Sequence, residues 1–158
     1  MEKIKKIYEK GLELLSRDKP NPKKAVNYFI KSWKKYLAMK AYDNVFDSID
    51  KIVESYHKYM KKPKLALKYL EYKHDLKQHL KDYKGSVETG IEIARMLREY
   101  KSLKDESIEF YRRAWNECMK FSINDNLTDT IKKEVYEVLL ELGKDEEHAK
   151  KYVNKHFR

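Results

Sequence analysis

Histidine and cysteine are the side chains with the widest catalytic and metal-binding chemistry, and this sequence holds six of them. They are His57, His74, His79, His148, His156 and Cys118. No histidine lies four residues from another, the spacing that would place two imidazoles on one face of a helix for metal binding. The sequence therefore predicts no histidine metal site, and we expect packing or surface roles for these residues.

The remaining residues form no recognisable catalytic pattern. A di-iron bundle would need Glu-x-x-His motifs on two helices, and the sequence does not repeat such a motif. Only four glycines occur in 158 residues, and no glycine-rich phosphate loop or nucleophile elbow is found. Cys118 falls on a predicted helix with Trp115, where we expect a small buried side chain. We therefore expect a protein that is not an enzyme and that binds no cofactor or metal.

Composition indicates an all-α protein in a reducing compartment. A single cysteine cannot form an intramolecular disulfide, which argues against a small secreted scaffold. No apolar run approaches the ~18 residues of a membrane span. The opening residues, MEKIKKIYEKGLELL, mix charged and apolar positions at helical spacing and lack the uninterrupted apolar segment of a signal peptide. We expect a cytoplasmic location.

A pattern with a period of about 41 residues runs through the sequence. Four segments align: AVNYFIKSW from Ala25, ALKYLEYKH from Ala66, SIEFYRRAW from Ser107 and AKKYVNKHF from Ala149. Three positions after each small first residue stand Tyr28, Tyr69, Phe110 and Tyr152, and eight positions after it stand Trp33, His74, Trp115 and Phe157. Offsets of three, four, seven and eight lie on one face of a helix.

The same register continues upstream of each segment. Ten positions before the small residue stand Leu15, Tyr56, Leu97 and Leu139, and fourteen before it stand Gly11, Ile52, Ile93 and Val135. These offsets describe the apolar stripe of a preceding amphipathic helix. Each repeat is thus a pair of helices, and such a period is typical of a solenoid.

We therefore predict a single α-solenoid domain over residues 1–158. Its four repeats span about 1–41, 42–82, 83–123 and 124–158. The predicted helices are 2–16, 23–39, 43–60, 64–80, 86–100, 104–120, 128–142 and 145–156. Pro22 and Pro63 stand at predicted helix starts, where a missing N–H is tolerated, while Gly143 and Asp145 should end one helix and cap the next.

The second helix of each repeat resembles that of the tetratricopeptide repeat family. The closest match is SIEFYRRAW, which carries Ser107, Phe110, Tyr111 and Ala114. Ala25, Phe29 and Tyr56 also fit the positions that the family gives to Ala, Phe and Tyr. The family period is about 34 residues, so this chain looks like a long-helix relative, of the kind seen in vesicle-fusion adaptors of the soluble NSF attachment type. A HEAT-like array, with a period of about 40–47 residues, is the structural alternative.

The resemblance implies a right-handed superhelix of four antiparallel helix pairs whose first helices line a concave groove. It also implies a scaffold that binds a peptide or protein partner, or another copy of itself, in that groove. The groove positions fall on Lys6, Arg17, Asp50, Glu54, Lys58, Arg95, Arg98, Lys133 and Glu137. Their mixed signs argue against a groove built only for an acidic peptide. Ordinary solvated helix faces are the alternative interpretation.

The net charge of +10 is concentrated at the start of the chain. Residues 1–40 hold 12 Lys and Arg against 4 Asp and Glu. This basic first repeat supports a second hypothesis, a nucleic-acid-binding protein that contacts phosphates with residues 1–40. Two observations weaken it: the lysines spread around two predicted helices instead of forming one stripe, and a Lys-rich surface is also typical of thermophilic proteins.

Overall fold

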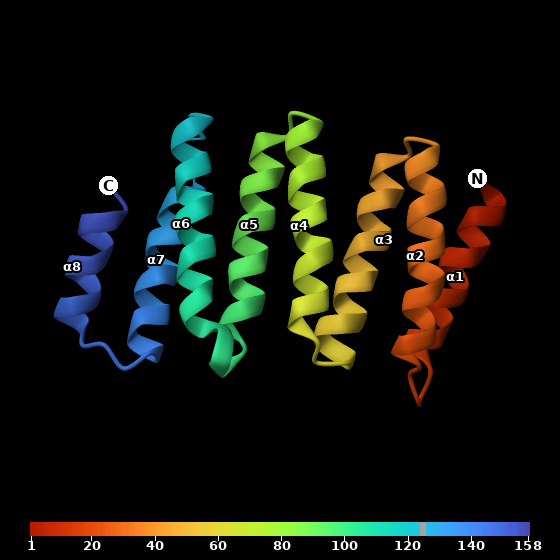
Figure 1. Cartoon of the computed structure of the whole chain (residues 1–158), viewed down its shortest axis with the longest axis horizontal. Coiled ribbons are helices and arrows are strands. Elements are labelled where there is room, and N and C mark those ends of the chain that lie inside the picture. The colour runs from red at the N-terminus through yellow and green to blue at the C-terminus, as the bar shows by residue number, and fades with distance from the viewer. Residues whose placement is uncertain (124–125) are drawn as a thin grey trace. The chain divides into compact units, whose positions relative to one another are not determined.

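The structure is a computed structural model, and it describes residues 1–123 and 126–158. The described residues form eight α-helices, packed as sequential antiparallel pairs (Figure 1). The helices are α1 (Glu2–Ser16), α2 (Pro22–Ala38), α3 (Tyr42–Glu54), α4 (Pro63–His79), α5 (Tyr83–Arg98), α6 (Lys104–Lys120), α7 (Asn126–Glu141) and α8 (Glu146–His156). The all-α prediction is confirmed, and the contacts, mainly between sequential helices, are consistent with a helical-repeat arrangement.

All eight predicted helices are present, and each helical segment ends within three residues of its predicted range. The helix predicted over 43–60 is α3 followed by a π-helical turn, η1 (Ser55–Tyr59), in which the Met60 N–H bonds the Ser55 carbonyl at 3.1 Å. A 3₁₀ turn, η2 (Lys101–Leu103), separates α5 from α6. The predicted boundary between the third and fourth repeats falls at residues 124–125, which lie outside the described residues.

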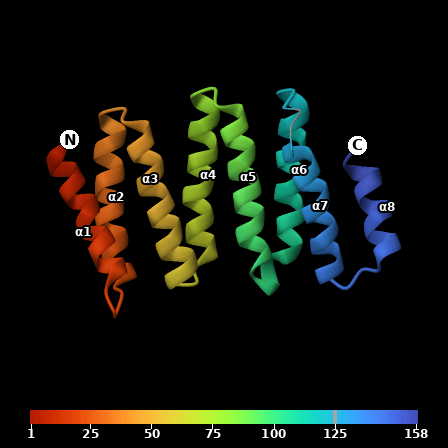
Figure 2. The same cartoon turned by 180° about the vertical axis from the view of Figure 1, so that it is seen from behind.

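The chain divides into two compact parts, residues 1–73 and residues 74–158, here called the N-terminal and C-terminal parts. In the N-terminal part, α2 lies between α1 and α3 (Figure 2), around a core that includes Leu14, Phe29 and Ile52. In the C-terminal part, α5 to α8 pack in chain order around Tyr111, Val135 and other buried residues. The single-domain assignment of residues 1–158 remains a prediction.

The repeat seen in the sequence corresponds to a repeat in burial. Ala25, Ala66, Ser107 and Ala149 are each 0% exposed. A small side chain at a helix crossing lets two helices approach closely, so that larger neighbours fill the core on either side. The positions that follow, Phe29, Leu70, Tyr111 and Val153, are also buried. The predicted register is therefore confirmed in all four repeats.

The ends of the second helices repeat with the same period of 41 residues. Lys40, Lys81 and Ser122 adopt left-handed backbone conformations, with φ of 54°, 62° and 53°. The residue after each donates its N–H to a carbonyl five residues earlier: Ala41 to Tyr36 at 3.0 Å, Asp82 to Lys77 at 2.9 Å and Ile123 to Cys118 at 2.9 Å. This is the hydrogen bond of a Schellman cap. The sequence pattern missed these caps because glycine, the usual residue in this conformation, is absent from them.

The predicted helix starts and stops that rest on Pro, Gly and Asp are confirmed. Pro22 opens α2, and the preceding Asn21 side chain accepts the Lys24 N–H at 3.1 Å. Gly143 has φ of +87° just after α7. The Asp145 carboxylate accepts the His148 N–H at 2.7 Å and caps α8.

Gly11 sets the distance between α1 and α2. A Cβ at this position would lie 2.6 Å from Cε1 of Phe29, whose side chain is fully buried. Gly90 in α5 is less crowded, because a Cβ there would lie 3.4 Å from the Cβ of Ala114. The α1–α2 contact therefore depends on the absence of a side chain at Gly11.

His74 occupies the one polar position in a column that otherwise holds Trp33, Trp115 and Phe157. It joins α4 to α6, because its Nε2 lies 2.6 Å from a Glu117 carboxylate oxygen. Its Nδ1 lies 3.0 Å from Asp75, and Gln78 also donates to Glu117. The hydrogen bond to Glu117 is the main reason that the pKa of His74 is raised above 6.5, although burial opposes it.

Ala66→Glu should lower the free energy of unfolding by about 4 kcal/mol, because a carboxylate would enter a fully buried position. The neighbouring Leu65 is 39% exposed, so Leu65→Glu should change it by no more than about 0.5 kcal/mol. Urea unfolding followed by circular dichroism measures both. Equal stability of the two variants would mean that the burial register of α4 is wrong.

Gly11→Ala should destabilise the protein by about 1 kcal/mol net, because the clash with Phe29 outweighs the gain in helix propensity. Gly90→Ala is the matched control and should be neutral or stabilising by up to about 1 kcal/mol, since alanine favours a helix over glycine. Thermal melts of both variants test this. A Gly11→Ala protein as stable as Gly90→Ala would show that Phe29 moves aside without cost.

His74→Phe should cost more stability at acidic than at alkaline pH. The raised folded pKa means that the stabilisation by His74 is fully present below pH 6.5 and is lost as pH rises through the folded value. Urea unfolding of the natural and variant chains across this range measures the difference. His79→Phe, at an exposed histidine at the end of the same helix, is the control. A stability difference independent of pH would contradict the His74–Glu117 assignment.

Candidate functional site

The nine predicted groove residues lie on the first helices of the four repeats or directly after them. Lys6 is in α1 and Arg17 follows it; Asp50, Glu54 and Lys58 are in α3 and η1; Arg95 and Arg98 are in α5; Lys133 and Glu137 are in α7. Lys6, Lys58 and Lys133 are exposed. The other six form ion pairs within the chain, so their charges are already engaged.

In the C-terminal part, the groove residues of α5 pair with carboxylates of α7. Arg95 Nε lies 2.7 Å from Glu134, and Arg98 Nη1 lies 3.1 Å from Glu137. Arg98 also binds Glu141, which raises the pKa of Arg98 and lowers that of Glu141. Sequence reasoning named Arg98 and Glu137 separately and missed that they pair. The signal was available, since the partners stand 39 and 43 residues apart, close to the repeat period.

In the N-terminal part, two of the three pairs are local. Arg17 lies 3.2 Å from Glu13, and Glu54 lies 2.7 Å from Lys51. Asp50 makes a longer-range pair, 2.8 Å from Lys73 of α4. The Arg17–Glu13 pair is exposed on both sides, and such a pair contributes about 0–1 kcal/mol, so it positions side chains more than it stabilises the fold.

The two parts differ completely in net charge. Residues 1–73 hold 19 Lys and Arg against 9 Asp and Glu, whereas residues 74–158 hold 17 of each. The whole net charge of +10 therefore belongs to the N-terminal part. A field of one sign raises the local concentration of oppositely charged ligands.

Helix α2 carries five lysines and no acidic residue. Lys23, Lys24, Lys31, Lys34 and Lys35 are all exposed. Helical geometry places them on the face opposite the buried Ala25, Phe29 and Tyr36. Within α2 the lysines therefore share one side of the helix, while the basic residues of the first repeat as a whole lie on both α1 and α2. We call these five residues the lysine ridge.

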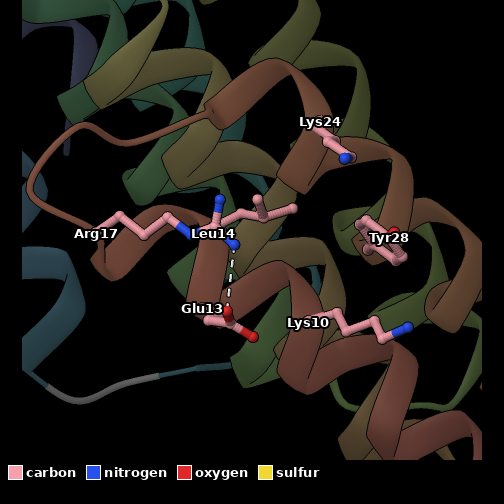
Figure 3. Close-up of a pocket in the computed structure, with 6 residues that line it drawn as sticks. All are labelled: Lys10, Glu13, Leu14, Arg17, Lys24 and Tyr28. Atoms are coloured by element: carbon pink, nitrogen blue, oxygen red, sulfur yellow. Dashed lines mark hydrogen bonds and ion pairs between the residues drawn. The ribbon is translucent and has the colours of Figure 1, made fainter.

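A basic cleft of about 200 Å³ lies between α1 and α2 (Figure 3). It is lined by Lys10, Glu13, Leu14, Arg17, Lys24 and Tyr28. Three cations face one carboxylate here, and Figure 3 shows that carboxylate, Glu13, bonded to Arg17. The surplus positive charge suits a carboxylate or phosphate group of a ligand.

The loop between α1 and α2 fixes the geometry of the basic cleft. The Asn21 N–H bonds the Leu14 carbonyl at 2.9 Å, while the Asn21 side chain caps α2. Lys24 and Tyr28 then follow on one face of α2, one turn apart. Tyr28 stands at the repeat position shared by Tyr69, Phe110 and Tyr152, which are all half-buried and are here called the aromatic column. The same residue that packs the repeat therefore also lines the cleft.

Burial is the main cause of the raised pKa values of two tyrosines. Burial, assisted by Asp47 and Asp50, raises the pKa of Tyr8 to about 12. Burial also raises the pKa of Tyr111, which is fully enclosed in the C-terminal core. Both phenols stay protonated at neutral pH. Cys118 is buried, as predicted. Across residues 1–123 and 126–158, His, Cys, Asp and Glu side chains form no group of three or more that could hold a metal ion.

Comparison with known proteins leaves the chain without a family assignment. No protein-family model matches it, and neither the curated proteins nor the solved structures include a match. In the part of the chain that the structure describes, every helix is too short or too polar to cross a bilayer. The molecule is thus established as an all-helical protein of eight described helices packed as sequential pairs.

Proposed function

We propose that this chain is a non-enzymatic interaction module that binds an acidic peptide or protein partner through its N-terminal part. The concentration of the whole net charge in residues 1–73 is the observation that carries this proposal. The lysine ridge and the basic cleft present that charge on exposed surfaces of α1 and α2. An acidic partner would be steered to this surface and held there by charge complementarity.

The architecture we propose is a right-handed, tetratricopeptide-like superhelix with a long repeat. The buried small residue and the aromatic column of each repeat support it. Such an array is rigid because each helix pair packs on its neighbours, so a partner loses little free energy in ordering the surface to which it binds. The first-helix surfaces remain the expected groove. The pairing of Arg95, Arg98 and Glu137 within the chain favours the N-terminal part as the principal contact.

Nucleic-acid binding is the second candidate function, and the lysine ridge is the observation that favours it. Five exposed lysines on one helix face could contact successive phosphates. Such binding would weaken steeply with salt. Self-association of the chain is a further possible arrangement, and the crosslinking survey described next detects it.

The test is a crosslinking survey in extract of the native cell at moderate salt, with a charge-neutralised variant beside the natural chain. In the variant Lys10→Gln, Lys24→Gln, Lys31→Gln, we expect recovery of the bound protein to fall about tenfold, because complementary charge is lost. The matched control is Lys144→Gln, Lys150→Gln, Lys155→Gln, which removes three exposed lysines from the C-terminal part.

Two results would contradict the proposal. Recovery of nucleic acid alone, removed by nuclease treatment, would establish the second candidate instead. An equal loss of protein partners in the two variants would show that total charge matters and that the N-terminal part is not the binding surface.

A further inference from the structure

A second cleft lies between α2 and α4, within the N-terminal part. It encloses about 260 Å³ and is lined by Ile30, Trp33, Lys34, Lys68, Tyr69 and Tyr72. We call it the aromatic cleft. It is distinct from the predicted groove, because its walls come from second helices of the repeats.

The aromatic rings of this cleft hold one another in place. Trp33 meets Tyr69 at 5.8 Å and Tyr72 at 5.1 Å between ring centroids, in both cases nearly perpendicular. Tyr56 of η1 stacks on Tyr69 at 6.0 Å with an interplanar angle of 22°. Edge-to-face and stacked contacts of this kind stabilise a fixed ring arrangement. The cleft is therefore formed before any ligand arrives.

We propose that the aromatic cleft receives one large apolar side chain from an acidic peptide segment, whose carboxylates bind Lys34 and Lys68. This inference rests on the proposed function and names the feature that the partner must carry. The mechanism combines burial of the apolar side chain against Ile30 and the rings with charge-assisted contacts at the rim.

Charge complementarity identifies the occupant as acidic. Lys34 and Lys68 are both exposed at the cleft, and Lys34 also belongs to the lysine ridge of a helix without carboxylates. Glu71, the acidic residue within residues 63–73 of α4, is exposed and does not line the cleft. A segment with carboxylates on both sides of an apolar residue would therefore meet cations on either wall.

The ring geometry favours an amino-acid side chain over a nucleobase. Stacking of successive bases requires open ring faces along a groove. Here Tyr56 stacks with an offset on Tyr69, and the nearly perpendicular contacts of Trp33 use further ring surface. A partly open cleft of about 260 Å³ has room for one side chain, which gains from burial without needing a parallel ring.

The experiment measures binding of two short synthetic peptides by fluorescence anisotropy. Both are rich in Asp and Glu; one has a central phenylalanine and the other a central alanine. We expect the phenylalanine peptide to bind about tenfold more tightly, because a buried aromatic side chain adds apolar contact that alanine lacks. Trp33 emission in a Trp115→Phe background, where it is the sole tryptophan, should change with the phenylalanine peptide.

Matched variants separate the cleft from general charge. Lys34→Glu with Lys68→Glu should weaken both peptides at least about tenfold. Lys144→Glu with Lys150→Glu makes the same change of net charge in the C-terminal part and should have little effect. Tyr72→Ala should abolish only the preference for phenylalanine, with thermal melting as the check on folding. Should that variant unfold, the peptide pair on the natural chain still decides the question.

The outcomes that overturn this inference differ from those that overturn the proposed function. Equal binding of the two peptides would remove the side-chain site, and equal weakening by both charge reversals would remove the role of Lys34 and Lys68. A single-stranded oligothymidine that binds more tightly than either peptide would make nucleic acid the occupant. If a crosslinked protein partner survives Lys34→Glu with Lys68→Glu, the proposed function stands and the aromatic cleft is not its site.

Discussion

Burial of one small residue in each repeat is the constraint on which this structure depends. Ala25, Ala66, Ser107 and Ala149 are completely buried, so a larger side chain at any of them would have to displace packed neighbours. The large residues beside these positions then fill the remaining space. The aromatic column is half-buried as a consequence, and it supplies the walls of both clefts in the N-terminal part.

Charged residues are balanced within the C-terminal part but not within the N-terminal part. In the C-terminal part, Arg98 lies between Glu137 and Glu141, so charges on adjacent first helices satisfy one another. In the N-terminal part, positive charge is in excess, and α2 has no carboxylate to balance its lysines. Self-repulsion among like charges opposes folding. An anionic partner bound to this part would relieve that repulsion, which is why binding by this part is the function we favour.

For the candidate site, the sequence predicted the residue types and their helices but not the contacts that they make. The excess of Lys in residues 1–40 was evident from the sequence, and so were the first-helix positions of Asp50, Arg95 and Glu137. Their pairing was not predicted, although the partners of Arg98 stand close to one repeat period away, because the contact itself forms only after the helices pack. The aromatic cleft was likewise hidden: Trp33 and Tyr72 belong to different repeats, and the spacing of each in the sequence indicates only a helix face.

The sequence by itself determined the eight helices, their pairing and the buried register, because helical periodicity and a 41-residue repeat are properties of local residue order. Tertiary structure alone decided the ion pairs between α5 and α7, the clefts beside α2 and the left-handed caps at Lys40 and Lys81. In each of these, atoms close in space belong to different helices, or the backbone adopts a conformation that its residue type does not favour. Packing of whole helices selects such features, and no local pattern encodes them.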